Sequence, residues 1–115
     1  MANTFKNITK AGVTSADVIY TVAGSTTSVV LGLMLGNTTS GTITATVTLG
    51  TDTANRAGNN NETNQDVELI TSTSIPGNST LELLAGNKVV METTDTLSVT
   101  GSGATDVALS VMEIT

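Results

Sequence analysis

Oxygen-bearing side chains gather in the segment 52–65, and by type they are the residues of this chain best suited to bind a metal ion. The segment reads DTANRAGNNNETNQ, and no hydrophobic period runs through it. A hard cation such as Ca²⁺ prefers about six to eight oxygen ligands. The spacing lacks the fixed alternation of an EF-hand loop, and Asn and Asp are also common turn residues. A solvated polar loop is the first interpretation. The alternative is a weak metal site, whose candidates are Asp52, Asn59, Asn61, Glu62 and Asp66.

Catalytic side chains are scarce. The chain has no His and no Cys, so a serine nucleophile would lack its usual general base, and no Ser-x-x-Lys motif supplies a lysine instead. A carboxylate pair is conceivable between Glu68 and either Glu82 or Glu92, because two carboxylates can share acid and base roles. On strands such residues usually face solvent. We expect no enzyme, no catalytic residues and no cofactor.

Composition and charge exclude several classes of partner. The chain has 115 residues, the size of one domain. Its formal net charge is −6 and its basic residues are scattered, so it lacks the basic patch that nucleic-acid binding needs. An acidic surface also repels anionic lipid, and the longest apolar run, 29–35, is too short to span a bilayer.

No apolar signal-peptide region follows Met1, so we expect synthesis in a cytoplasm without a leader.

The segment 42–49 indicates the fold class most clearly. Its aliphatic residues (Ile43, Ala45, Val47, Leu49) alternate with threonines, which is the pattern of a half-buried strand. Similar segments, separated by Gly- and Asn-rich turns, predict a single-domain, all-β antiparallel β-sandwich over 1–115, jelly-roll or Ig-like, with about eight strands and almost no helix. The candidate strands are 4–10, 18–22, 28–35, 42–49, 66–73, 80–84, 88–92, 97–100 and 107–114.

The sequence also predicts the structure of two short connections, of the N-terminal segment and of the long polar segment. Ala85-Gly86-Asn87 is expected to link a hairpin between the strands on either side of it, and Gly101-Ser102-Gly103 is expected to be a turn. Residues 1–10 form either the first strand or an arm that reaches a neighbouring subunit. Residues 52–65 form the long polar loop.

Two strands are apolar in both phases of the alternation. In 29–35, Val29, Leu31, Leu33 and Leu35 would share one face, with Val30 and Met34 on the other. Such a strand lies in the middle of a sheet or at a subunit interface, and we expect the middle. The last strand, 107–114, has the same property. Two explanations are open for it: a β-bulge near Val111-Met112 switches the phase of the alternation, or the strand is buried on both faces.

The core should be aliphatic and thin, because the chain has one Tyr, one Phe and no Trp. A thin core favours burial against other subunits, so we expect a homo-oligomer, with a trimer as one possibility. The Thr-rich face is either a solvated strand surface or a docking surface, since a weakly charged face of short side chains would lose little side-chain entropy on docking. Sugar stacking on Tyr20 or Phe5 is a minor alternative, because both residues lie inside strand patterns, where a core or interface role is favoured. The interface candidates are Phe5, Tyr20, Val30, Met34, Met112 and Ile114.

The last forty residues carry a family resemblance. They contain IPGNSTLELL, then GNKVVME, then TDTLSV, and they close on the strand VALSVMEI. This pattern resembles small β-sandwich structural proteins of tailed bacteriophage virions, including those of marine cyanophage type. The match covers about a third of the chain.

The resemblance implies a non-enzymatic structural role. It implies a capsid decoration or cement protein on the outer surface of the phage particle, with the major capsid protein or other virion proteins as partners. The net charge of −6 fits the outside of a shell better than its DNA-facing side. The alternative is a neck, tail or tail-tip component that binds host receptor or glycan through the 52–65 loop. A pilus or adhesin subunit would need an export leader.

Overall fold

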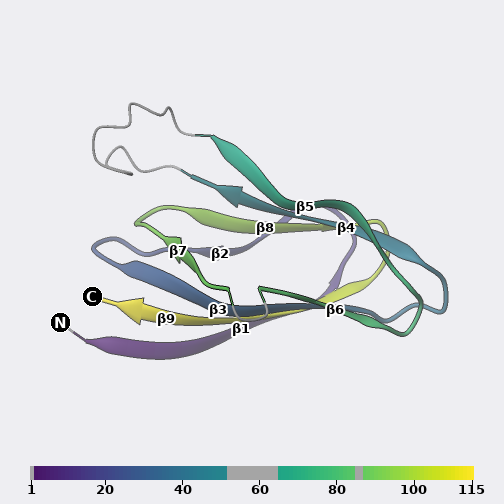
Figure 1. The fold of residues 1–115 in the computed structure, drawn as a ribbon, viewed down its shortest axis with the longest axis horizontal. Coiled ribbons are helices and arrows are strands. Elements are labelled where there is room, and N and C mark those ends of the chain that lie inside the picture. The colour runs from purple at the N-terminus through teal and green to yellow at the C-terminus, as the bar shows by residue number, and fades with distance from the viewer. Residues whose placement is uncertain (1, 52–64, 85–86) are drawn as a thin grey trace.

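The computed structural model describes residues 2–51, 65–84 and 87–115, and in these residues the chain is all-β. Its strands lie in two antiparallel sheets that pack face to face, as the two layers in Figure 1 show. The described residues include no helix long and apolar enough to cross a membrane. The strands are β1 (Asn3–Val13), β2 (Asp17–Thr21), β3 (Thr27–Asn37), β4 (Ile43–Gly50), β5 (Asp66–Ile75), β6 (Thr80–Leu83), β7 (Val89–Met91), β8 (Thr96–Gly101) and β9 (Thr105–Ile114).

The order of the strands is that of a jelly roll, which confirms the predicted sandwich. The five-stranded sheet has the order β1-β9-β3-β6, with β7 also paired to β3, and the four-stranded sheet has the order β2-β8-β4-β5. The chain therefore crosses from one sheet to the other between β1 and β2, β2 and β3, and β3 and β4. An Ig-like sandwich begins with neighbouring strands in one sheet, so the jelly-roll alternative is the observed one.

The prediction of a hairpin around Ala85-Gly86-Asn87 is wrong. β6 and β7 do not pair with each other; both pair antiparallel with β3, at different parts of its length. Together they form one interrupted edge strand. Leu84, directly after β6, has a φ of +61°, a backbone conformation that L-residues rarely adopt outside turns. The gap lies opposite Leu31 and Gly32 of β3.

β3 does lie in the middle of its sheet, but the predicted division of its faces is wrong. The register shifts between Val30 and Gly32, which is a bulge of the kind that Gly often marks. The inward-facing residues are therefore Ser28 and Val30 before the bulge and Leu33, Leu35 and Asn37 after it.

Both alternatives predicted for the last strand, a β-bulge near Val111-Met112 and burial on both faces, are wrong. β9 pairs with β1 in unbroken register from Val107 to Ile114, opposite Lys10 to Asn3. Its residues alternate strictly between buried and more exposed positions from Thr105 to Ile114, so β9 faces the core on one side only.

The apolar part of the core between the two sheets consists of aliphatic side chains, Met91 and Tyr20. β4 supplies Ile43, Ala45 and Val47, as its alternation predicts. The largest fully buried apolar side chains are Leu33, Leu35, Ile75, Met91, Leu97 and Leu109.

The two ends of the sandwich are built differently. At one end the chain termini lie side by side (Figure 1), and Ala2 and Thr115 exchange two backbone hydrogen bonds. At the other end, the buried Asn37 amide donates to the carbonyl oxygens of Gly41 and Ile75 at 2.8 and 2.9 Å, and its oxygen accepts from the Thr39 N–H at 2.9 Å. This one side chain joins the loop after β3 to the end of β5.

Candidate docking surface

The predicted metal site falls mostly on residues that the structure does not describe. Asp52, Asn59, Asn61 and Glu62 lie outside the described residues. Asp66 is exposed at the start of β5. Among the residues that the structure describes, no group of three or more Asp, Glu, His or Cys side chains is placed to hold a metal ion.

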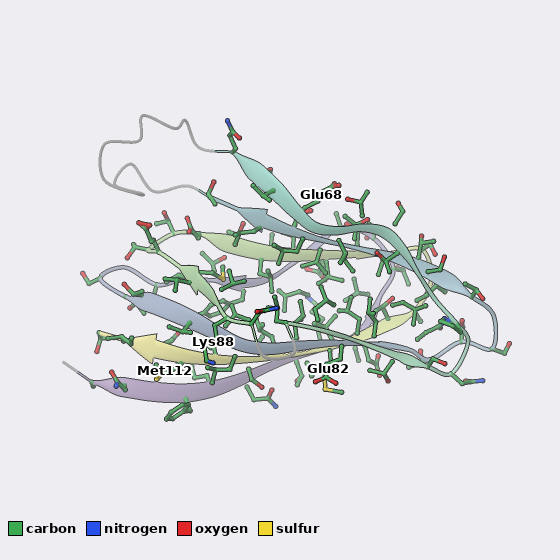
Figure 2. All side chains as sticks on the ribbon, in the orientation of Figure 1. Glu68, Glu82, Lys88 and Met112 are labelled. Atoms are coloured by element: carbon green, nitrogen blue, oxygen red, sulfur yellow. The ribbon has the colours of Figure 1, made fainter. Side chains whose placement is uncertain are left out.

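The conceivable carboxylate pairs are not brought together. Glu68 belongs to β5 of the four-stranded sheet, whereas Glu82 belongs to β6 of the five-stranded sheet. Figure 2 shows these two side chains on opposite outer sides of the sandwich. Glu92 follows β7, which also belongs to the five-stranded sheet, so it likewise lies on a different sheet from Glu68. Neither predicted pair brings its two carboxylates to the same side of one sheet, as a shared acid–base site would need.

On the outer face of the four-stranded sheet, the two central strands, β4 and β8, present short hydroxyl side chains. Thr46 of β4 lies opposite Thr100 of β8, and Thr48 lies opposite Ser98. Thr44 and Thr96 extend the same face. Opposed threonines of this kind suit a solvated strand surface. This is the polar face that the threonine alternation predicts.

The outer face of the five-stranded sheet has the opposite character. Phe5 of β1 lies opposite Met112 of β9, Met112 lies opposite Val29 of β3, and Val29 lies opposite Val90 of β7. We call these four residues the apolar row. Phe5 is 72% exposed and Val90 is 60% exposed. The row therefore crosses the sheet with large apolar side chains in water, which is unusual for a monomer surface.

A shallow groove lies on the same outer face, toward the end of the sandwich away from the termini. Its volume is about 390 Å³, and its lining includes Thr9, Met34, Thr80, Asp106 and Ala108. Met34 lies opposite Ala108 of β9 and Glu82 of β6, and it is 46% exposed. The Asp106 carboxylate accepts a hydrogen bond of 3.0 Å from the Gly12 N–H, so it is held at the rim by β1.

Four of the six interface candidates lie on this outer face. Phe5 and Met112 belong to the apolar row, Ile114 lies opposite Asn3 and Thr27 beside that row, and Met34 lies at the groove. Figure 2 shows Met112 on the outer side of the sheet.

The other two interface candidates, Val30 and Tyr20, are buried inside the sandwich. Val30 is 1% exposed and Tyr20 is 9% exposed. Val30 points inward because it precedes the bulge in β3. Tyr20 points inward from β2, so it offers no ring for a sugar or a partner.

Tyr20 instead belongs to a polar network inside the sandwich. Its hydroxyl donates to Glu113 Oε2 at 2.5 Å and lies 3.0 Å from Ser28 Oγ. A phenol has one proton, so the Ser28 hydroxyl donates to the phenol oxygen. Lys6 completes the network, with Nζ 2.8 Å from Glu113 Oε1. Tyr20 comes from the four-stranded sheet and the other three residues from the five-stranded sheet, so the network joins the two layers.

The network shifts two pKa values in opposite directions. The ion pair and hydrogen bond with Lys6, followed by the hydrogen bond from Tyr20, hold the pKa of Glu113 below its ordinary value. Burial, followed by the hydrogen bond to Glu113, raises the pKa of Tyr20 to about 12. The network therefore favours an ionised carboxylate and a neutral phenol at neutral pH.

A signal for this network was present in the sequence. Val107, Leu109 and Val111 define the inward phase of β9, and Glu113 continues that phase. A carboxylate in the buried phase of a strand requires partners. The partners themselves come from three other strands, which sequence spacing does not bring together.

Comparisons with known proteins add little to this picture. No protein-family model matches the chain, and the comparison with curated proteins found no match. One solved structure is similar over 99% of this chain and 87% of that one, with 15% identity and a TM-score of 0.48. That structure comes from work on Bacillus endospore appendages, described as a family of disulfide-linked pili. A likeness of this degree does not bear on function.

Proposed function

We propose that the protein is a non-enzymatic structural subunit of a bacteriophage virion, a capsid decoration or cement protein that binds the outer surface of the major capsid protein lattice. The observation that supports this proposal best is the difference between its two outer faces. One face presents opposed hydroxyl side chains, such as Thr46 and Thr100, and the other presents the apolar row and the groove at Met34.

A subunit held between a large assembly and solvent needs such a difference. The apolar face would dock, because covering Phe5 and Val90 removes large apolar surfaces from water. The hydroxyl face would remain in solvent. Fold alone does not fix function, since jelly rolls serve many roles. The virion setting is supported by the resemblance of the last forty residues, and the outward position is supported by the net charge of −6.

The test is the copy number and position of the protein in purified particles of the phage that encodes it. Quantitative mass spectrometry should give hundreds of copies per particle for a repeating shell component, whereas a neck or tail part would give about a dozen or fewer. Cryo-electron microscopy should place the five-stranded sheet against the capsid surface. Absence of the protein from purified particles would reject the proposal.

A matched pair of variants tests the docking face. Val90→Glu places a charge on the apolar row at a side chain that is already 60% exposed, so the fold should tolerate it. Ser98→Glu places the same charge on the hydroxyl face, where its cross-strand neighbours are Thr48 and Val18 and no carboxylate lies directly opposite. The first variant should be lost from particles and the second should be retained, with similar thermal stability in both.

A further inference from the structure

Three of the four sheet edges in the described part of the chain are protected against pairing with another strand. β2 has five residues and a register shift between Val18 and Tyr20. β5 has irregular register against β4, and Ser72 within it has a φ of +44°. The β6–β7 edge is interrupted. Short, bulged or broken edges of this kind discourage edge-to-edge association.

The fourth edge, β1, is long and regular. It pairs with β9 in unbroken register from Asn3 to Lys10, and it contains no proline. Ala2 and Thr115 exchange both backbone hydrogen bonds, with N···O distances of 3.3 and 3.0 Å. Bonded residues alternate along an antiparallel strand. The even-numbered residues of β1 therefore bond to β9, and the odd-numbered residues direct their N–H and C=O groups to the open edge; these are Asn3, Phe5, Asn7 and Thr9.

We propose that β1 pairs with β1 of a second copy of this chain, antiparallel, about a two-fold axis beside Phe5. In this register Phe5 lies opposite the partner's Phe5, and Asn3 lies opposite the partner's Asn7. Each such pair exchanges two backbone hydrogen bonds. The two five-stranded sheets then form one continuous sheet across the dimer, with an isologous interface.

The side chains favour a second copy as the occupant of this edge. Among the described residues, Phe5 is the most exposed large hydrophobic side chain, at 72%, and it ends the apolar row at the open edge. Pairing about Phe5 joins this row to the partner's row, so that one apolar band crosses the combined sheet. Opposed aromatic side chains on neighbouring strands stabilise a sheet. In the same register, the Asn3 side-chain amide lies opposite the partner's Asn7 amide, and Asn7 lies opposite the partner's Asn3.

The charges of β1 also fit self-association. A charge on an edge strand can block pairing, but Lys6 and Lys10 are each held in an ion pair of 2.8 Å, with Glu113 and Asp17. The Phe5-centred register places Lys6 opposite the partner's Thr4. A register centred on Lys6 would oppose two lysines, which is unfavourable. β1 itself has no carboxylate, so two chains of net charge −6 would meet along an edge free of acidic side chains.

This inference goes beyond the proposed function and does not depend on it. It concerns the isolated chain, so its test needs no particle. A protein absent from virions could still form this dimer, and a decoration protein could still be monomeric in solution.

The first test is the mass of the full chain by sedimentation equilibrium, at concentrations of about 1 to 100 μM. A dimer is expected. Asn7→Pro removes an N–H that points to the open edge while leaving the bonds to β9 intact, and proline is tolerated at such edge positions. It should raise the dimer dissociation constant about 10- to 100-fold. Asn7→Ala, which keeps that N–H, is the control. A monomer or a trimer of the unaltered chain would overturn the proposal.

The second test maps the register by cross-linking, because the chain has no cysteine of its own. Cα atoms in hydrogen-bonded antiparallel pairs are about 5.5 Å apart, within disulfide range. Phe5→Cys should therefore form a covalent dimer under mild oxidation, whereas Val18→Cys, exposed on β2, should not. A mixture of Asn3→Cys and Asn7→Cys chains, which retains Phe5, should give the mixed disulfide. A dimer that cross-links through Val18→Cys and not through β1 would also overturn the proposal.

Discussion

The Tyr20 hydroxyl lies 2.5 Å from Glu113 Oε2, across the interior of the sandwich. Tyr20 belongs to β2 and Glu113 to β9, so this contact crosses from one sheet to the other. Both residues are 9% exposed. Apolar contacts between the two layers have no directional requirement, whereas this hydrogen bond forms only when the two sheets are correctly positioned relative to each other.

Tyr20→Phe should lower the free energy of unfolding by about 1–3 kcal/mol, because it removes the hydroxyl but leaves Glu113 and Ser28 buried without this partner. Urea unfolding followed by circular dichroism measures the change. Glu113→Gln and the double variant complete a double-mutant cycle. A coupling energy near zero would mean that the two side chains do not interact in solution.

Stability should fall in acid because of Glu113. The pKa of this carboxyl is lower in the folded chain than its ordinary value of 4.5, mainly through Lys6. As the pH falls, the unfolded chain therefore takes up the proton first. The stabilising contribution is complete above pH 4.5 and is lost as the pH falls toward the folded pKa. Urea midpoints measured from neutrality down to about pH 3 should show this loss, and Glu113→Gln should reduce it.

Stability should also fall in alkali, through Tyr20. Its pKa is raised from 10.0 to about 12 in the folded chain, so the unfolded chain loses the proton first as the pH rises. The contribution is present below pH 10 and is lost between pH 10 and 12. A spectrophotometric titration should show the phenol ionising only as the protein unfolds. Ionisation near pH 10 in the folded protein would contradict the burial of the hydroxyl.

Much of the fold could be predicted from the sequence because the signal is local. In β4, Ile43, Ala45 and Val47 alternate with threonines, and both faces behave as that alternation predicts. Turn residues between such segments separate the strands, and each of the nine predicted segments contains or overlaps an observed strand. Period-two alternation requires no knowledge of the partner strand.

The features that could not be predicted depend on partners that are distant in the sequence. Alternation does not say where a bulge interrupts a strand, so the pattern places Leu33 on the face of Leu31, whereas the bulge between Val30 and Gly32 separates their faces. Turn residues do not say which strands pair, so the sequence predicts a β6–β7 hairpin, whereas both strands pair with β3. The sequence leaves Tyr20 between a core and an interface role, because the partners that decide it, Glu113 and Ser28, lie on other strands.

The bulge in β3 gives a sharp test on two adjacent residues. Leu33 is 0% exposed and Met34 is 46% exposed. Leu33→Ala should cost about 2–5 kcal/mol of unfolding free energy, since it leaves a cavity in the core. Met34→Ala should cost less than about 1 kcal/mol, because surface substitutions usually have small effects. Similar costs at both positions would mean that β3 is buried on both faces in solution.

Gly77 should be the glycine least tolerant of a side chain among those in the turns at the Asn37 end of the sandwich. A Cβ atom there would lie 2.2 Å from the Ser40 carbonyl oxygen and 2.5 Å from its carbon. Those are backbone atoms of the loop after β3, which Asn37 holds against the end of β5. The clash therefore cannot be relieved by turning a side chain.

Gly77→Ala is thus expected to lower the unfolding free energy by about 1–3 kcal/mol, as overpacking does, and the melting temperature by about 4 °C or more. Gly24→Ala is the matched control, because a Cβ at Gly24 meets nothing within 4 Å, and it should leave the melting temperature nearly unchanged. Differential scanning calorimetry measures both. If Gly77→Ala has the same melting temperature as the unaltered protein, the loop after β3 and the turn after β5 separate in solution, and Asn37 does not hold them together.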